Sequence, residues 1–251
     1  LAQVAYGNVG LRRYVDLDVL IPAERFAEAQ DLLHEIGYRG AQSKQKIQGW
    51  RRELHLALSG QWPFVCKNGP FVIDLHTRLM PPGYSLTADF EPFWARSKNV
   101  QIGDVEVRSF APEDMLVILC FHGVKNQWRA LKHVVDIAEL IQSQPTLDWQ
   151  SVIERAESTR ASRVLKLGLQ LAYEVVEAPL PPAIQKWIDH APMDDMAGSM
   201  MGYLRNRHKK AELTYSERVR LQLATKDAIV DQLRYSGYSL MQHLWTGILE
   251  P

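Results

Sequence analysis

The stretch from Tyr14 to Ile21 constrains the fold of this chain more than any other. Apolar residues occupy every second position, namely Val15, Leu17, Val19 and Ile21, and Asp16 and Asp18 lie between them. Side chains two residues apart share one face of a β-strand, so the pattern predicts a buried apolar face and two neighbouring carboxylates on the other. Such a pair needs a compensating cation, and oxygen ligands favour Mg²⁺ or Mn²⁺. The alternative is an exposed strand end with two solvated acids.

A third acid follows on a second predicted strand, from Phe71 to Leu79. Its alternation puts Asp74 and His76 on one face, opposite Ile73 and Leu75. The range 50–58 also alternates in part, and the turn at 67–70 predicts that it forms a hairpin with this strand. Asp74 is therefore a third candidate ligand, and His76 either orients an acid or donates to a phosphate, or is a structural histidine.

The chain changes character near residue 111. Before it, one helix (23–36) and short strands, including 105–109, predict an α/β domain over residues 1–110. After it, the pattern predicts a helical domain over residues 111–251. The expected helices are 115–123, 127–143, 149–158, 162–176, 182–190, 193–209 and 216–232. The fold class is thus α+β, with a small mixed sheet, flanking helices and a helical C-terminal domain.

Composition narrows the function classes. The chain has 29 basic and 29 acidic side chains, so no overall attraction to nucleic acid or to an anionic membrane is expected. Cys66 and Cys120 form no C-x-x-C pair, which argues against a zinc site and fits a cytoplasmic protein. No apolar run approaches the ~20 residues of a membrane span. Because residues 1–6 resemble the middle of a helix, we expect the natural sequence to extend upstream.

A second polar set lies on the helices between 115 and 143. It consists of His122, Lys125, Arg129, Lys132, His133 and Asp136, at intervals of three and four residues. Such residues share one helix face, and their cations either reach a triphosphate or form a solvated surface. Asp136 is expected to anchor one of these cations. A basic cluster at 205–210 is expected to complement a helix end, with an RNA or acceptor contact as the alternative.

A D-x-D pair with one acid on a neighbouring strand is the arrangement that holds two Mg²⁺ ions in nucleotidyl transfer. The order of several motifs supports this interpretation. They are Gly10-Leu11-Arg12, Asp16-Leu17-Asp18, Glu35-Ile36-Gly37-Tyr38, Ile73-Asp74-Leu75-His76, the segment 122–131, and Val135-Asp136-Ile137-Ala138. Over roughly residues 1–180, this order resembles the uncharacterised nucleotidyltransferase family of the DNA polymerase β-like superfamily.

The resemblance implies a polymerase β-like core and metal-dependent transfer of a nucleotidyl group. It places Asp16, Asp18 and Asp74 at the metal positions, and Arg12 at the arginine that precedes the acids. Arg12 either contacts a triphosphate oxygen or neutralises Asp16 or Asp18. One feature departs from the family, because the Lys-Gly pair that members carry before the glycine turn does not occur before residue 11.

These observations predict a Mg²⁺- or Mn²⁺-dependent enzyme that moves an NMP from an NTP to a hydroxyl or phosphate acceptor. Asp16, Asp18 and Asp74 would bind the metal, and Arg12, Lys125, Lys132 and His76 would contact the nucleotide. The acceptor could be a small molecule, a protein or an RNA end. One alternative is an inactive scaffold that binds a nucleotide or a protein partner, and another is a metal-dependent phosphohydrolase.

Overall fold

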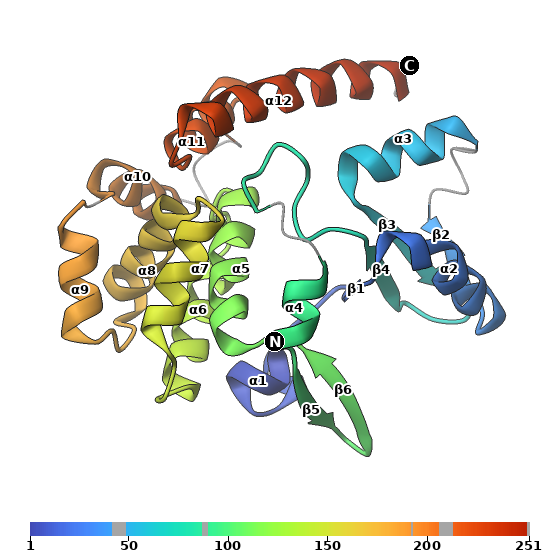
Figure 1. Ribbon diagram of the computed structural model, residues 1–251, viewed down its shortest axis with the longest axis horizontal. Helices are drawn as coiled ribbons and strands as arrows, with labels where there is room; N and C mark the ends of the chain where they lie inside the picture. The colour runs from blue at the N-terminus through green and yellow to red at the C-terminus, as the bar shows by residue number, and fades with distance from the viewer. Residues whose placement is uncertain (42–48, 87–89, 192, 206–212, 250–251) are drawn as a thin grey trace.

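The computed structural model describes residues 1–41, 49–86, 90–191, 193–205 and 213–249. Figure 1 shows a small sheet with two flanking helices on one side and a group of packed helices on the other. The N-terminal helix α1 (Ala2–Tyr6) lies against the helical side, and the chain then crosses to the sheet. At the C-terminus, α12 (Ile229–Leu249) runs above the helices and points over the sheet side.

The sheet is mixed and has four strands in the order β1-β4-β3-β2. Its strands are β1 (Leu17–Leu20), β2 (Tyr38–Gly40), β3 (Gln61–Cys66) and β4 (Val72–His76). β1 runs parallel to β4, while β4 pairs with β3 and β3 with β2 in antiparallel fashion. The flanking helices are α2 (Phe26–Glu35), which continues a single 3-10 turn at Ala23–Arg25, and α3 (Trp50–Ser59).

One apolar cluster holds the sheet to its helices. Its buried members are Phe26, Leu33, Trp62, Phe64 and Leu75, with Val19 and Ile21 packed against them. The predicted apolar face of the first strand is thus partly buried, and only in its second half. Val15 and Leu17 are 78% and 57% exposed, because β1 is an edge strand that begins at Leu17 and nothing in the described part of the chain covers its start.

The prediction of a strand over residues 50–58 is wrong, because this range forms α3. It contains no β-branched residue and ends at Gly60, which adopts the left-handed conformation (φ 70°) that favours a helix end. The strand that pairs with β4 is β3 instead. Pro63 lies within β3, and since proline is rare inside a sheet, the sequence does not indicate a strand there.

Several further elements, β2 among them, were not predicted from the sequence. The short helix α4 (Phe90–Arg96) leads into a hairpin of β5 (Lys98–Ile102) and β6 (Val105–Ser109), of which only the second strand was expected. The hairpin turns at Gly103, whose φ of 57° suits glycine. Figure 1 shows the hairpin projecting beside α1.

The helical side contains the larger core, which takes in residues of the N-terminal range such as Ala5, Tyr84 and Phe93. Its helices are α5 (Pro112–Lys125), α6 (Lys132–Ser143), α7 (Trp149–Ser158), α8 (Ser162–Val176), α9 (Pro182–Asp189), α10 (Asp194–Arg205), α11 (Tyr215–Ala224) and α12. The α+β class and the helical C-terminal part are confirmed, whereas the domain boundary at residue 110 stays a prediction. Among the described helices, none combines the length with the apolar composition that a membrane span requires.

The helix predicted over 127–143 begins only at Lys132, because a tight turn precedes it. Gln127 and Trp128 both have positive φ, and the Trp128 amide donates to the Gly123 carbonyl oxygen (2.8 Å). This turn folds the fully buried Trp128 indole back onto α5. The C-terminal turn of α5, which carries His122 and Lys125, is thereby fixed.

The predicted helix over 216–232 is two helices in the structure, α11 and α12. The chain leaves the helix between them because Asp227 caps another one. Its carboxylate accepts hydrogen bonds from the backbone amides of Ser162 (2.7 Å) and Arg163 (2.9 Å), at the start of α8. A capping carboxylate satisfies amides that have no partner within their own helix, and it complements the helix dipole.

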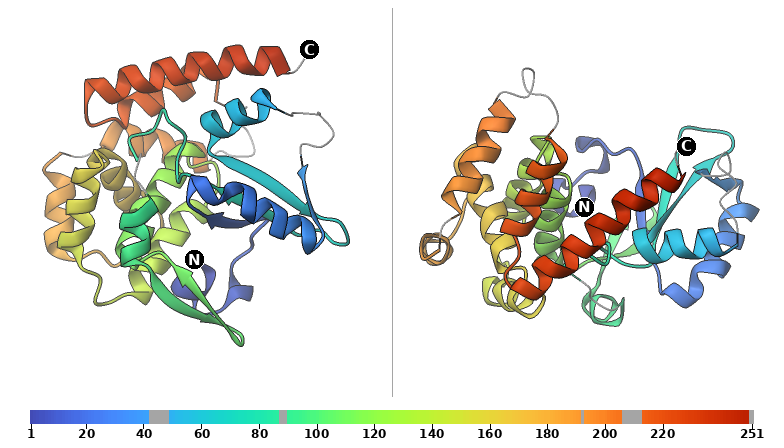
Figure 2. Two further views of the ribbon diagram at one scale, coloured as in Figure 1. Left: turned by 45° about the vertical axis from the view of Figure 1, so that its right-hand side comes forward. Right: turned by 90° about the horizontal axis from the view of Figure 1, so that it is seen from above.

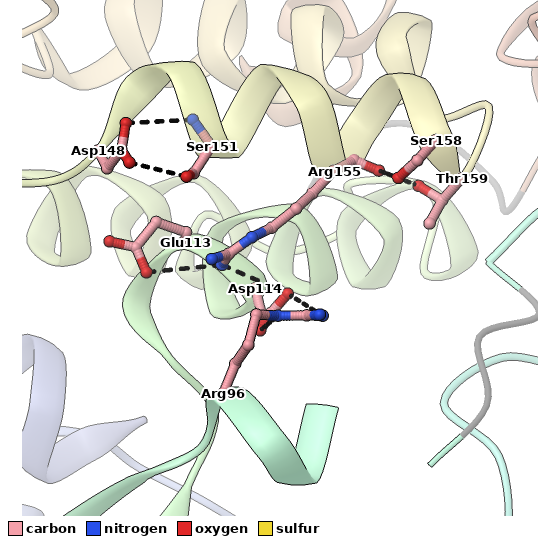
Figure 3. A network of polar contacts seen from close by, with 8 residues as sticks. All are labelled: Arg96, Glu113, Asp114, Asp148, Ser151, Arg155, Ser158 and Thr159. Carbon is pink, nitrogen blue, oxygen red and sulfur yellow. Dashed lines mark hydrogen bonds and ion pairs between the residues drawn. The ribbon is translucent and has the colours of Figure 1, made fainter. Parts of the chain in front are cut away.

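A buried carboxylate ties α4 and α7 to the start of α5. Asp114 is almost wholly buried and accepts two hydrogen bonds from Arg96, both of 2.9 Å. Arg155 of α7 lies 3.4 Å from the same carboxylate and 3.5 Å from Glu113, as Figure 3 shows. The two arginines compensate a charge that would otherwise be costly to bury.

The tight contact between α5 and Trp128 yields a stability prediction. A Cβ atom on Gly123 would lie 2.4 Å from the Trp128 ring, which is fully buried and has little room to shift. We therefore expect Gly123→Ala to lower the free energy of unfolding by about 1–3 kcal/mol, as overpacking does. Urea denaturation followed by circular dichroism measures it.

Gly198→Ala is the matched control, because Gly198 also lies within a helix, but a Cβ atom on it would have open space around it. Among the described residues beyond its own helical backbone, none would come within 4 Å of that atom. The substitution should leave stability unchanged or raise it by up to ~1 kcal/mol, from helix propensity alone. Equal effects of the two substitutions would contradict the packing argument.

Candidate active site

The register of the sheet brings two of the predicted acids together. Asp18 on β1 and Asp74 on β4 are direct partners across the parallel pair, and Leu20 is the partner of His76. Register partners point to the same face of a sheet, as do residues two apart along one strand. The sequence pattern on each strand, combined with this register, therefore gathers Asp18, Asp74 and His76 at one place.

These three side chains have the spacing of a metal site. Their ligand atoms all lie within 4.8 Å of one another. His76 Nε2 is 2.9 Å from Asp18 Oδ1, and since a carboxylate only accepts, the imidazole N–H is the donor. Asp74 Oδ1 is buried and has no hydrogen-bond partner among the described residues. An unpaired buried carboxylate oxygen beside a second carboxylate fits a divalent cation with oxygen ligands.

The two carboxylates have opposite pKa shifts. The hydrogen bond from His76 lowers the pKa of Asp18 below its ordinary value, with help from the charges of His122 and Lys125 against the effect of burial. Burial raises the pKa of Asp74, and the negative charges of Asp16 and Asp18 add to this. Asp18 thus stays ionised readily, whereas Asp74 holds a proton more easily.

Two basic residues of α5, Lys125 and His122, act electrostatically on these acids. The Lys125 ammonium lies 3.5 Å from Gln61 Oε1 at the start of β3. Burial lowers the pKa of Lys125, and the charges of Asp18, Asp74 and Asp16 oppose that shift. Burial also lowers the pKa of His122, with Lys125 adding to the shift and Asp18 opposing it. The predicted helix face thus contributes His122 and Lys125 to the same site.

Asp16 lies apart from the group of three. It is exposed, precedes the first residue of β1, and does not belong to the cluster within 4.8 Å. Its charge nevertheless acts on Asp74 and Lys125. The structure therefore places Asp16 at the edge of the site and His76 inside it.

Arg12 has a different partner from the two that the sequence suggested. Its guanidinium donates two hydrogen bonds of 2.8 Å to the Asp136 carboxylate on α6, not to Asp16 or Asp18. The Tyr6 hydroxyl donates a third, of 2.7 Å, to the same carboxylate. Asp136 is 1% exposed. Asp136 therefore anchors a cation as expected, but the cation comes from the N-terminal segment and not from its own helix pair.

Lys132 lies at the exposed first turn of α6. Its charge acts on His122 and on His133, whose pKa burial lowers to about 4. His133 is buried, with its ring edge-on to His122. The basic cluster predicted at 205–210 lies almost wholly outside the described residues, since only the backbone of Arg205 is described.

Comparison with protein families decides the assignment of the chain. The sequence model of the uncharacterised nucleotidyltransferase family matches residues 1–177. The chain belongs to this family. The match confirms the resemblance in the sequence and contains every residue of the site described above. Comparisons with curated proteins and with solved structures returned no match.

Sequence reasoning missed two supporting residues of this family member. Tyr6 holds Asp136 from α1, and Gln61 contacts Lys125 from β3. Neither residue belongs to a charged motif, so only the fold reveals it. His55, within the range predicted as a strand, lies on α3 with its ring edge-on to Trp62.

The buried pair of Arg12 and Asp136 yields a double-mutant prediction. Arg12→Met leaves the Asp136 charge buried without its main partner, so we expect a loss of about 3 kcal/mol in the free energy of unfolding. The double variant R12M/D136L removes both charges and should recover most of that loss. Chemical denaturation of the two single variants and the double variant measures the coupling, and purely additive losses would show that the pair is not coupled.

The raised pKa of Asp74 predicts how stability depends on pH. The folded state disfavours ionised Asp74, so metal-free protein carries a penalty at pH values above this raised pKa, and the penalty disappears as the pH falls through it. Asp74→Asn should therefore raise the melting temperature in EDTA at pH 7.5, and this gain should shrink towards pH ~4. A variant that is less stable than the native protein at pH 7.5 would contradict the prediction.

Proposed function

We propose that this protein is a metal-dependent nucleotidyltransferase with a polymerase β-like core, which moves an NMP from an NTP to a hydroxyl or phosphate acceptor. The observation that carries the proposal is the pairing of Asp18 and Asp74 in register, with one buried oxygen of Asp74 left without a partner among the described residues. Membership of the family supports the same reaction class.

Asp18 and Asp74 would hold the divalent ion, Mg²⁺ or Mn²⁺, with Asp16 as a further acid at the edge. Bound there, the ion would neutralise triphosphate charge and lower the pKa of the attacking hydroxyl. His76 orients Asp18 through its hydrogen bond, as residues behind a metal ligand commonly do.

In the proposed reaction, an acceptor oxygen forms a bond to the α-phosphorus of the NTP. The bond between that phosphorus and the oxygen bridging to the β-phosphate breaks, and pyrophosphate leaves with the electron pair. Asp74 accepts the proton of an acceptor hydroxyl as general base. The acceptor gains an NMP and loses a proton, so the step balances without another reactant.

The cations divide into two roles under this proposal. Lys125 and His122 project from α5 towards the acids, and we assign Lys125 a contact with a phosphate oxygen. Arg12 is held by Asp136, but it still lies close enough to Asp18 to feel its charge. Asp136 balances most of that charge, so we assign Arg12 mainly the role of holding the segment that leads into β1. Lys132, exposed on α6, would reach only the outer end of the nucleotide.

One observation favours the alternative, an inactive scaffold that binds a nucleotide. Asp16 stays outside the group of ligand atoms, so two carboxylates and one imidazole remain where two metal ions would need more oxygen ligands. A phosphohydrolase would use the same acids with water as the acceptor. Product analysis separates these three functions.

Substitution of the two paired acids tests the proposal. We expect Asp18→Asn and Asp74→Asn to reduce Mn²⁺-dependent NTP binding and pyrophosphate release by about 100-fold or more, since they remove the ligands themselves. His76→Gln should cost about 10–100-fold. Thermal shift with each NTP and Mn²⁺, pyrophosphate release from γ-labelled NTP, and the fate of the NMP group of α-labelled NTP are the measurements.

Asp104→Asn is the control, because Asp104 is an exposed acid in the turn between β5 and β6 and should leave both readouts unchanged. NTP binding without transfer to any acceptor would favour the scaffold, and release of NMP to water would favour the hydrolase. Unchanged Mn²⁺-dependent NTP binding in both acid variants would contradict the proposed metal site.

A further inference from the structure

The C-terminal helix α12 buries its polar side and exposes its apolar side. The side chains that face the rest of the protein are all buried or half-buried, namely Asp231, Tyr235, Tyr238, Ser239 and Gln242. Those that face outwards are 43–74% exposed, namely Ile229, Val230, Leu233, Leu240, Met241 and Leu244. A helix on the surface of a monomer normally has the opposite arrangement. The outer side of α12 therefore has the composition of an interface.

Specific contacts fix which side of α12 faces outwards. The Asp231 carboxylate is 1% exposed and lies 3.4 Å from Arg160 Nη1, in the turn that follows α7. The hydroxyls of Ser239 and Tyr215 share a hydrogen bond of 2.8 Å between α12 and α11. Figure 2 shows α12 lying across the surface of the molecule in both views. Turning the helix to bury its leucines would break both polar contacts, so the leucines stay exposed in the single chain.

The outward residues follow a heptad repeat, which we call the α12 seam. Successive members are separated by three, four, three and four positions, and they are Val230, Leu233, Gly237, Leu240 and Leu244. This spacing is the pattern along which one helix packs against another in a coiled coil. Ile229 and Met241 are exposed beside the seam and widen it. The spacing thus indicates that the partner of α12 is another helix.

The α12 seam is nearly symmetric about Gly237. Leu233 lies four residues before this glycine and Leu240 three residues after it, while Val230 and Leu244 each lie seven residues away. A second α12 that runs in the opposite direction would therefore place each apolar side chain against another one. Interfaces between identical copies related by a two-fold axis need such self-complementarity. A Cβ atom on Gly237 would have no described residue within 4 Å, so the backbone is open to close approach there.

The area of this surface fits a second copy of the chain. Six exposed side chains of this size present roughly 600 Å² on each copy, so a pair would bury about 1,200 Å², the lower limit for a stable specific interface. Among the described residues on the outer side, Arg234 alone carries a fixed charge, so little repulsion opposes the pairing. A membrane fits less well, because helices that lie in a membrane surface carry basic residues on their polar side, and here that side is buried in protein.

We propose that α12 is a dimerisation helix, which packs antiparallel against α12 of a second copy of this chain, with Gly237 at the crossing point. Burial of the exposed leucines drives the association. The missing side chain at Gly237 lets the two backbones approach closely at the two-fold axis. The dimer is independent of the proposed nucleotidyl transfer, since none of the acids takes part in it.

Sedimentation velocity of the full chain tests the proposal. We expect the native protein to form dimers at about 100 µM. The variant L233D/L240D should stay monomeric, with the dissociation constant raised by about 100-fold or more, because the dimer would bury four unpaired carboxylates. Leu32→Asp is the matched control, since Leu32 is 58% exposed on α2, as Leu240 is on α12. It should leave the dimer unchanged. A native protein that is monomeric at this concentration overturns the proposal.

A second variant covers the case in which L233D/L240D does not fold. Gly237→Glu raises helix propensity, so the monomer should keep or gain stability, but the substitution puts two like charges at the crossing point and should abolish the dimer. Gly198→Glu is its control, because Gly198 is an exposed glycine of α10 with similarly open space around it among the described residues. A dimer that survives Gly237→Glu overturns the proposal.

Disulfide cross-linking tests the direction of the two helices. In a Cys66→Ser background, Leu233→Cys and Leu240→Cys should cross-link only when the two variants are mixed, since an antiparallel pair brings only these positions within the ~7 Å between Cα atoms that a disulfide needs. Cys120 is fully buried and should stay unreactive. Cross-linking of Leu233→Cys alone would indicate a parallel pair. Binding to phosphatidylcholine–phosphatidylglycerol vesicles without dimers would indicate a membrane contact. Either result overturns the proposal.

Discussion

The pair between Arg12 and Asp136 is the interaction on which the arrangement of the site depends. A charge as deeply buried as Asp136 requires a partner, and the partner comes from the segment that leads into β1. Tyr6 joins them from α1, so three parts of the chain meet at one carboxylate. This ties the edge strand of the sheet to α6, and thereby holds Asp18 opposite the last turn of α5. Without that tie, the acids and Lys125 would belong to separately packed groups of residues.

Next to this pair, the surroundings of two carboxylates shift their pKa values in opposite directions. Asp18 is stabilised as an anion by His76, whereas Asp74 is buried beside other negative charges. Opposite pKa shifts at two neighbouring acids are typical of a functional site. The tight turn at Gln127 and Trp128 also contributes, because it fixes the end of α5, which carries His122 and Lys125.

Local sequence patterns identified the residues of the site, but not the residues that they contact. Alternation along the strands identified Asp18, Asp74 and His76, and helical spacing identified Lys125 and Asp136. The partners of these residues could not be predicted, since the pairing of Arg12 with Asp136 spans 124 positions and depends on packing. Misassignments followed from local ambiguity. The alternating leucines over 50–58 suggested a strand, although this range forms α3. Pro63 argued against a strand where β3 lies. Asp227 interrupts a helical sequence pattern and caps α8 instead.

The boundary of the family match has an evolutionary consequence. Residues 1–177 contain the acids and the basic residues near them, whereas α11 and α12 lie beyond it. The two stretches nevertheless touch, because the Gln222 side chain on α11 donates to the Val124 carbonyl oxygen beside Lys125. Selection could alter the C-terminal helices without disturbing the acids. Members of the family that share the acidic motifs can therefore differ in the helices that follow, and a comparison between members has to treat the two stretches separately.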